Sequence, residues 1–224
     1  MKVLVACEFS GIVRDAFIAK GHEAWSCDFL PSDKPGNHIQ DDVLKHLNEN
    51  WDLMIAFPPC KYICNGGNNW LNRRPDLKWR ENRILAAEFF MRFVTAWIPK
   101  IAIENPIGSM SSLYRKPDQI IRPFMFGHEY NKDVCLWLKN LPKLKGTKFI
   151  PPPYKHLDFW STERHKCGRD IKAITFQGIA EAMADQWGEL RHAGVSGQRL
   201  AAGASMHPLR QKESVWISSG RKEW

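Results

Sequence analysis

Short apolar runs recur along the first 140 residues and predict the strands of a sheet. The clearest run is 52–56, where Asp52 precedes four apolar side chains and Pro58 and Pro59 follow. A strand without a polar face is typical of a sheet covered on both sides, and proline ends it because it offers no N–H to the ladder. The same reasoning predicts strands over 2–7, 22–28, 134–138 and within 100–106.

Helical periodicity appears in three stretches, 12–20, 79–98 and 175–190. Gly21 follows the first stretch and is expected to end it in a left-handed conformation. The apolar positions of the second stretch wrap widely around the helix, which predicts that it is largely buried. The third carries an apolar stripe formed by Ile179, Met183 and Trp187.

The order of these elements predicts an α/β fold. Strand, helix and strand within the first 28 residues form a right-handed βαβ unit, and such units lead to a parallel sheet. We expect one Rossmann-like domain over 1–190 with a mostly parallel, doubly wound sheet, in which 141–175 is an irregular insertion. Residues 191–224 lack any periodic pattern and are expected to form a poorly ordered tail.

The remaining segments of the predicted domain are connections. Residues 29–40 are predicted as a loop, 41–50 as a short helix or turn, and 123–130 as a loop or edge strand. The connection over 57–80 is long for a compact domain, and such connections are usually functional or mobile. It holds Trp70 and Trp79, which suit either the core or stacking on nucleic-acid bases.

Composition narrows the class of protein. An apolar share of 44% and a charged share of 25% are ordinary for a soluble globular protein. No run approaches the roughly 18 apolar residues that span a bilayer, and the first residues turn acidic too soon for a signal peptide. A cytoplasmic protein with six reduced cysteines and no membrane partner is therefore expected. Cys60 and Cys64 have no second Cys or His pair at zinc-site spacing, so no metal is expected.

The net charge of +8 favours a polyanionic partner or simply solubility. Part of the excess lies in 191–224, which holds six Lys and Arg residues against two Glu. A basic tail of this kind can bind phosphates in a salt-sensitive way.

The turn after the first strand, Glu8-Phe9-Ser10-Gly11, offers backbone N–H groups to a ligand because a helix follows it. It holds one glycine, so it is not a GxGxxG phosphate loop, and a plain tight turn is the alternative. Asp28 ends the next strand, where an acid can accept hydrogen bonds from a ribose diol. The pair suggests an adenosine-containing cofactor without a phosphate clamp, a description that fits S-adenosylmethionine better than NAD.

Cys60 stands on a proline-stiffened loop just past the carboxyl end of a strand, the edge at which open α/β sheets bind ligands. There it is a candidate nucleophile, the alternative being a small buried hydrophobe. Glu104 follows the strand within 100–106 in the same way. If the two strands are neighbours, its carboxyl group reaches the same crevice and can share a proton with a ring nitrogen; otherwise it caps the next segment.

Together these residues resemble the cytosine-5 DNA methyltransferases, in particular the small forms of phage genomes. The turn at 8–11 resembles the family's first motif, in which a Phe-x-Gly turn cradles S-adenosylmethionine. Asp28 falls at the ribose-binding acid, and Asp41-Asp42-Val43 resembles the third motif, whose acid meets the adenine amino group. The resemblance implies S-adenosylmethionine as cofactor, held by Glu8, Phe9, Ser10, Gly11, Asp28, Phe29, Asp41, Asp42 and Pro58.

Two more motifs carry the implied chemistry. Pro58-Pro59-Cys60 resembles the family's Pro-Cys motif with the nucleophile, and Glu104-Asn105-Pro106 resembles its Glu-Asn motif, which contacts ring nitrogen 3 of the target cytosine. Residues 176–183 resemble the last motif, a helix that returns beside the first. The resemblance covers about residues 2–188 and implies that Cys60 adds to carbon 6 while carbon 5 accepts the methyl group. A base in a duplex is first flipped out of the stack. Pro59 and Asn105 are the implied substrate contacts.

The chain also departs from the family pattern. Lys61 replaces the usual Gln after the cysteine, and the Gln-x-Arg-x-Arg motif that holds the target base is not evident, which leaves Arg164 and Arg169 as candidates to replace it. The stretch 141–175 is too short for the family's large target-recognition region. The substrate therefore stays open between duplex or single-stranded DNA and a free pyrimidine nucleotide such as dCMP. A catalytically silent nucleic-acid-binding protein is the alternative of another class.

Overall fold

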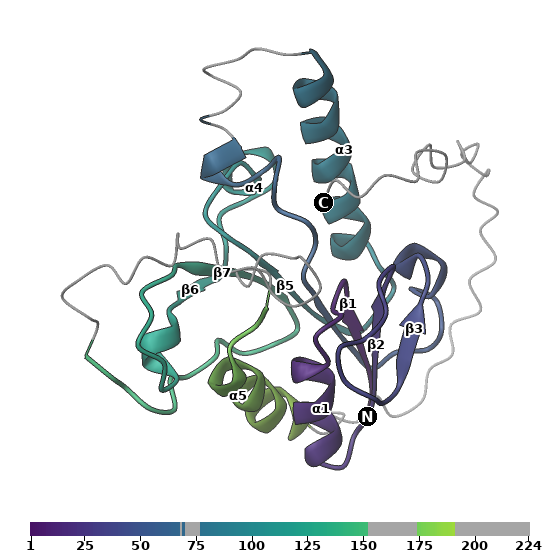
Figure 1. The fold of residues 1–224 in the computed structure, drawn as a ribbon, viewed down its shortest axis with the longest axis vertical. Helices are drawn as coiled ribbons and strands as arrows, with labels where there is room; N and C mark the ends of the chain where they lie inside the picture. Colours follow the sequence, from purple (N-terminus) through teal and green to yellow (C-terminus); the bar gives the residue numbers. More distant parts are fainter. Residues whose placement is uncertain (68, 70–76, 152–173, 191–224) are drawn as a thin grey trace. The chain divides into compact units, whose positions relative to one another are not determined.

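A computed structural model describes residues 1–67, 69, 77–151 and 174–190 of the chain. Within these residues seven strands form one sheet in the order β3-β2-β1-β4-β5-β7-β6 (Figure 1). The strands are β1 Lys2–Ala6, β2 Glu23–Asp28, β3 His38–Gln40, β4 Leu53–Ala56, β5 Lys100–Asn105, β6 Gln119–Ile121 and β7 Val134–Lys139. The helices are α1 Ile12–Ala19, η1 Val43–Lys45, α3 Leu77–Val94, α4 Met110–Leu113, η2 Pro123–Met125 and α5 Gln177–Gly188.

The sheet is mixed but mostly parallel. β1 pairs in parallel with β2 and β4, and the pairs β2–β3 and β4–β5 are parallel as well. β7 alone runs antiparallel, to β5 on one side and β6 on the other. The predicted α/β class is therefore confirmed. The strand order reverses between β1 and β4, and ligands of open α/β sheets bind beside such a reversal.

The first βαβ unit forms as predicted. Helix α1 ends beside Gly21, whose φ of 79° confirms the left-handed C-terminal residue. Two strands were not predicted, β3 inside the supposed loop 29–40 and β6 just before 123–130. Both have only three residues and pair on one side. Such short edge strands have no run of apolar residues from which they could be recognised.

Helix α3 differs from its prediction. It spans 77–94 rather than 79–98, and it is not largely buried: Leu77 and Ile84 are 75% and 60% exposed. Its buried side chains are Ala86, Phe90 and Phe93, which join the core cluster of the sheet. In Figure 1 the end of α3 that holds Leu77 projects away from the sheet, so the apolar residues there have no sheet to cover. Wide apolar spacing was therefore a wrong guide to burial.

The sheet carries helices on both faces. Phe90 and Phe93 of α3 pack in one cluster with Met54 of β4 and Ile101 of β5. α1 and α5 lie side by side on the other face (Figure 1). The predicted stripe of α5 is confirmed, because Ile179, Met183 and Trp187 are all buried.

A buried arginine locks the loop after β2 onto α1. Arg14 is fully buried, and all five of its N–H groups are engaged. They donate to Asp15 at 2.8 Å, to the hydroxyls of Ser26 and Ser32 at 3.2 and 3.0 Å, and to the carbonyls of Lys34 and Pro35 at 3.3 and 3.1 Å. A guanidinium can be buried only with such partners, since an unpaired buried charge is strongly destabilising.

The predicted insertion and tail are described only in part. Residues 141–151 are irregular, whereas 152–173 and the tail 191–224 lie outside the described residues, together with Arg164, Arg169 and Trp70. The described residues up to Glu189 belong to one compact unit. No helix of the described part is both long and apolar enough to cross a membrane.

Replacing Arg14 tests the lock. Arg14→Lys keeps the charge but cannot reach five acceptors, so we expect the free energy of unfolding to fall by about 3 kcal/mol. Urea unfolding followed by circular dichroism measures it. The exposed Arg92→Lys on α3 is the matched control and should change stability by less than about 0.5 kcal/mol. Equal unfolding midpoints for the two variants would contradict the lock.

Candidate functional site

Two strand tips carry the predicted catalytic residues, and they are neighbours. β4 pairs in parallel with β5, with Ala56 opposite Ile103, so Cys60 and Glu104 follow at the same edge of the sheet. The side-chain amide of Asn105 donates to the Pro58 carbonyl oxygen at 2.9 Å, and Asn105 is 1% exposed. The two predicted motifs are thus tied by a buried hydrogen bond.

The loops beyond these tips pair as well. The Ser109 N–H donates to the Ile63 carbonyl at 2.7 Å, and the Asn65 N–H donates to the Ile107 carbonyl at 3.1 Å. Gly108 lies between them, where an added Cβ would approach the Ile63 oxygen and Cys64 Cα to well under 3.0 Å. The chain needs glycine there because backbone touches backbone.

Trp79 fastens α3 to the same loop. Its indole N–H donates to the Gly67 carbonyl at 3.2 Å, and its ring meets Tyr62 edge to face at 4.6 Å between centroids. The sequence left Trp79 open between the core and stacking on bases. In the structure its half-buried ring packs against the loop that carries Cys60.

Cys60 lies beside a second thiol, Cys64. One helical turn joins them, since the Cys64 N–H donates to the Cys60 carbonyl at 2.9 Å, and the Cys64 thiol donates to the Lys61 carbonyl at 3.7 Å. The Gly67 N–H donates to Cys64 Sγ at 3.4 Å. Both side chains are half-buried. This spacing is visible in the sequence, where it was considered only as a pair of zinc ligands.

The two sulfurs differ in proton affinity. The neighbouring Cys60 thiol, helped by backbone N–H groups including that of Gly67, lowers the pKa of Cys64 to about 6. The neighbouring Cys64 thiol, then burial and the nearby Glu104 side chain, raise the pKa of Cys60. The two thiols therefore titrate as a pair and not as independent groups.

The carboxyl group of Glu104 has a raised pKa. Burial raises the pKa of its carboxyl group, and the positive charge of Lys132 opposes that shift. Lys132 comes just before β7, whose Cys135 lies opposite Asn105, and it acts on Cys60 in the same direction. Sequence reasoning missed Lys132, because a single lysine ahead of a strand carries no signal.

The turn after β1 holds a second buried acid, Glu8, which is 5% exposed. The Ser10 hydroxyl donates to Glu8 Oε1 at 2.5 Å and accepts from the Ile12 N–H at 3.3 Å. Glu8 Oε2 has no hydrogen-bond partner among the described residues, and burial raises the pKa of this carboxyl group. A buried acceptor of this kind suits the ammonium group of a ligand.

The turn itself is held in an unusual backbone conformation. Cys7 and Gly11 have φ of 58° and 73°, and Phe9 between them is buried. An added Cβ on Gly11 would lie 2.5 Å from Nη2 of Arg14, so only glycine fits against the buried guanidinium.

Acids from two further segments meet the end of β1. Burial first, and then Asp28, Cys27 and Asp42, raise the pKa of the Cys7 thiol, so these carboxylates lie near it. Asp28 Oδ1 accepts from the Leu30 N–H at 3.0 Å. Asp28 and Asp42 therefore lie near the end of β1.

Three other predicted residues have contacts of their own. Asp42 caps η1 by accepting from the Leu44 N–H at 3.0 Å. Asp41 accepts from Lys45 at 2.8 Å, and this hydrogen bond with that of the Asp42 N–H lowers the pKa of Asp41 to about 2. Phe29 is 58% exposed. These contacts give Asp41 and Asp42 a local structural role.

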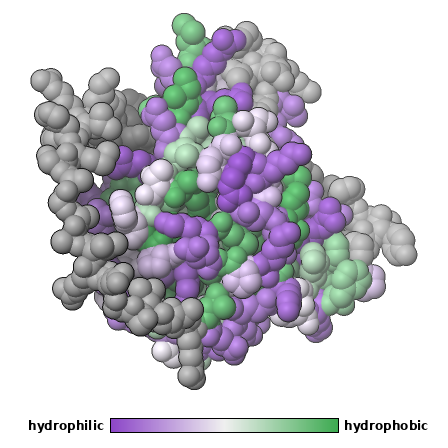
Figure 2. Space-filling view, turned by 180° about the vertical axis from the view of Figure 1, so that it is seen from behind, coloured by the Kyte–Doolittle hydropathy of each residue, from purple (hydrophilic) through white to green (hydrophobic). Residues whose placement is uncertain are grey.

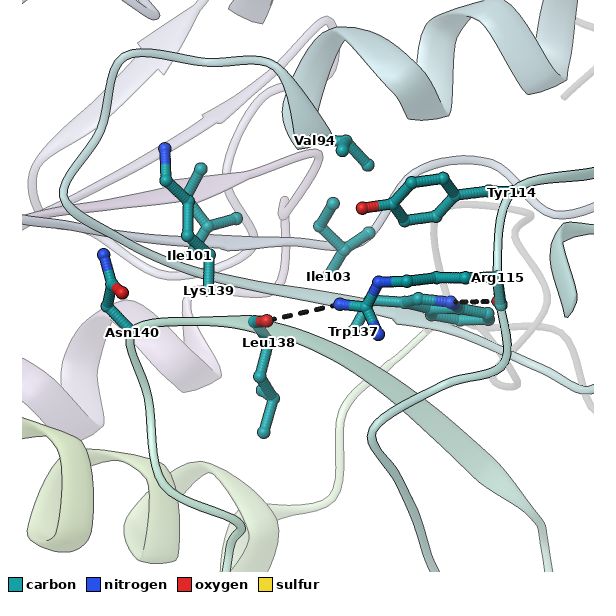
Figure 3. Close-up of a pocket in the computed structure, with 9 residues that line it drawn as sticks. All are labelled: Val94, Ile101, Ile103, Tyr114, Arg115, Trp137, Leu138, Lys139 and Asn140. Atoms are coloured by element: carbon teal, nitrogen blue, oxygen red, sulfur yellow. Dashed lines mark hydrogen bonds between the residues drawn. The ribbon is translucent and has the colours of Figure 1, made fainter.

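Two cavities lie elsewhere. No predicted catalytic, cofactor or substrate residue lines either of them, although Gln177 and Glu181 of the predicted last motif line the second. One, of about 340 Å³, lies between Val94 of α3, β5 and β7 (Figure 3). Its polar groups already serve the fold: the Trp137 indole donates to the Arg115 carbonyl at 2.8 Å, and Lys139 donates to the Ala96 carbonyl at 3.1 Å. The other, of about 350 Å³, lies between α1 and α5. Within the described ranges no cluster of His, Cys, Asp and Glu is arranged to hold a metal ion.

A scan against models of known protein families finds no match for the chain, and a search of curated proteins finds none either.

Adding a methyl group at Gly108 tests the pairing of the two loops. We expect Gly108→Ala to lower the free energy of unfolding by about 1–3 kcal/mol, because the new Cβ forces backbone atoms apart. Gly66→Ala is the control, since its Cβ would meet only Cys64 Sγ at 3.7 Å. Urea unfolding compares the two, and equal stability would show that the loops are not held together.

Glu104 makes stability depend on pH. Because folding raises its pKa, its contribution is complete below the unfolded pKa of about 4.3 and is lost as pH rises through the folded pKa. Glu104→Gln should therefore be more stable than the wild type at about pH 8, with a flatter pH dependence. The exposed Glu129→Gln is the control. A Gln variant less stable than the wild type at that pH would contradict the buried acid.

Proposed function

We propose that the chain is an S-adenosylmethionine-dependent methyltransferase of the cytosine-5 DNA methyltransferase type. One observation carries the proposal: the Asn105–Pro58 hydrogen bond fixes the tips of β4 and β5 together, with Cys60 beyond one tip and Glu104 at the other. The mixed sheet of seven strands is compatible with a methyltransferase fold.

The cofactor would occupy the edge formed by the ends of β1 and β2. Glu8 offers an unpartnered, buried carboxylate oxygen to an ammonium group, and Asp28 stands at the end of β2, where a ribose diol is bound in dinucleotide-binding folds. When bound, S-adenosylmethionine supplies the methyl group that carbon 5 of the cytosine accepts. The structural argument for these residues is their convergence near Cys7.

Cys60 and Glu104 divide the work on the pyrimidine ring. The Cys60 sulfur forms a bond to carbon 6, and the electron pair of the 5,6 double bond moves toward nitrogen 3. Glu104, whose carboxyl pKa is raised by burial, is positioned to share a proton with nitrogen 3 and so to remove the developing charge. Carbon 5 is thereby made nucleophilic.

The reverse sequence releases the product. A base removes the hydrogen of carbon 5 after methylation, the bond between Cys60 and carbon 6 breaks, and the sulfur leaves with its electron pair. The proton at nitrogen 3 returns to Glu104, so the net products are 5-methylcytosine, S-adenosylhomocysteine and one proton. Covalent catalysis of this kind splits one difficult step into easier ones.

The substrate is proposed to be cytosine in DNA. The net charge of +8 and the positive Lys132 beside Cys60 and Glu104 suit a polyanion. A free nucleotide such as dCMP carries the same ring and remains the comparison substrate in the test.

The test incubates the protein with methyl-labelled cofactor and either a cytosine-containing oligonucleotide or dCMP. We expect 5-methylcytosine in the oligonucleotide. Cys60→Ser and Glu104→Gln should lower the rate by about a thousandfold or more, whereas the exposed Glu129→Gln should not change it. An oligonucleotide with 5-fluorocytosine should trap a covalent adduct at Cys60, because fluorine at carbon 5 cannot leave as a proton does. If only dCMP is labelled, the substrate is the free nucleotide and not DNA. Full activity of Cys60→Ser would overturn the mechanism.

A further inference from the structure

Three cationic side chains stand at the loop that carries Cys60, and the proposed chemistry does not use them. They are Lys61, directly after Cys60, and Arg80 and Arg83 of α3, and together they are called the basic surface here. Lys61 is also the position at which the chain departs from the Gln of the cytosine-5 DNA methyltransferase pattern. A positive charge in place of an amide suits a substrate that carries negative charge next to the reacting base.

The backbone at Lys61 is held in place while its side chain is exposed. The Cys64 thiol donates to the Lys61 carbonyl at 3.7 Å, and an added Cβ on Gly67 would clash with the same oxygen. The Lys61 ammonium group lies 5.3 Å from the centroid of the Tyr62 ring. Such a cation–π contact is weak at an exposed site, so the ammonium group remains available to an anionic partner.

Helix α3 packs on the same loop on both sides of Arg83. The Trp79 ring meets Tyr62 of the loop edge to face at 4.6 Å between centroids, and Ala86 belongs to the same buried cluster as Ile63 of the loop. Arg83 is four residues after Trp79 and three before Ala86, so it lies on the same side of the helix as both. The fold therefore places the half-buried Arg83 against the loop that carries the proposed nucleophile.

The two arginines have no anion of their own. Arg80 and Arg83 are three residues apart and thus adjacent on the helix surface, where like charges repel each other. Neither acid of the helix, Glu81 or Glu88, is three or four residues from either arginine. Among the described residues the two guanidinium groups form no ion pair or hydrogen bond. An uncompensated pair of positive charges of this kind favours a polyanion.

We infer that the basic surface binds the phosphodiester backbone of DNA next to the target cytosine. The inference rests on the proposed role of Cys60 as the nucleophile, because that role brings the target base to this loop. The first half of α3 projects beyond the sheet, which leaves room for a strand beside it (Figure 1). Contacts with phosphates position a strand without reading its sequence. The surface thereby favours a polymer over dCMP, which has no phosphodiester backbone.

The first measurement is binding and needs no methylation. Fluorescence anisotropy follows a labelled, cytosine-containing oligonucleotide titrated with the full-length protein at several salt concentrations. Each cation in contact with a phosphate contributes about 0.7–0.9 to the slope of log affinity against log salt concentration. Lys61→Gln and Arg83→Gln should each reduce the slope by that amount and weaken binding about fivefold at about 0.15 M salt.

The controls separate a phosphate contact from a structural role. Arg83→Lys keeps the charge and should keep most of the slope. Arg92→Gln removes an exposed charge from the same helix, four residues after the acid Glu88, and should leave affinity and slope unchanged. Urea unfolding midpoints of the variants should match the wild type. A purely structural role of Arg83 would lower the midpoint and weaken binding without changing the slope.

The second measurement is the methylation assay with the combined variant Lys61→Gln, Arg80→Gln and Arg83→Gln. Because the lost contacts bind the ground state and the transition state equally, KM for the oligonucleotide should rise about tenfold or more while kcat stays within about twofold. An acidic polypeptide, polyglutamate, should compete with the oligonucleotide far less well than unlabelled DNA does.

The outcomes separate the inference from the proposed function. Equal affinities and salt slopes for the wild type and the folded combined variant overturn the basic surface, even if DNA is methylated. Polyglutamate that competes as well as DNA overturns the choice of partner. A protein that methylates dCMP and binds no oligonucleotide overturns the inference while Cys60 keeps its role. A slope that falls as expected, in a protein that methylates neither DNA nor dCMP, refutes the proposed function and leaves the DNA-binding surface in place.

Discussion

The hydrogen bond from the Asn105 amide to the Pro58 carbonyl is the contact on which the site depends. Pro58 is the last buried residue before the chain turns outward, and Pro59 has no N–H with which to continue the sheet. The carbonyl would therefore be a buried acceptor without a partner, a state that is destabilising by about 1–3 kcal/mol. Asn105 satisfies it from the neighbouring strand, so the register of β4 and β5 is carried beyond their last ladder bonds to the residues that follow. Backbone pairing around Gly108 extends the same connection by another turn.

Several groups at the carboxyl edge of the sheet lower the stability of the folded protein, and packing in the rest of the fold offsets this loss. Glu8 and Glu104 are acids whose pKa is raised by burial, and Cys7 has a positive φ that is strained for a residue with a side chain. Each feature disfavours folding and positions a reactive or binding group. The compensation lies in apolar packing on both faces of the sheet and in the fully engaged guanidinium of Arg14. Such a division between a strained edge and a well-packed centre is common at functional sites.

Much of the central fold could be predicted from sequence because its strands are buried on both sides. Continuous apolar runs predicted β1 and β4, whereas β3 and β6 are too short and too exposed to be recognised from their sequence. The error in α3 has a physical origin, since helix periodicity records where apolar residues stand and not whether a sheet lies opposite them. Arg14 was missed for the reverse reason: an arginine in a helix usually faces solvent, and its burial depends on carbonyls of a distant loop. The neighbourhood of Cys60 and Glu104 followed from two similar strand endings, and Cys64 is near Cys60 in the chain, but the approach of Lys132 depends on tertiary contacts.

The antiparallel direction of β7 has a consequence for how this edge is supplied with side chains. At parallel strands the residues that come after the strand reach the edge, whereas at β7 the residues that come before it arrive there. Lys132 reaches Cys60 and Glu104 by this route. The connection from β6 to β7 is therefore a second source of side chains for the same crevice. It is also tied to the start of α5, because the Gly178 N–H donates to His128 Nε2 at 2.9 Å, so the last helix helps to fix the loop that carries Lys132.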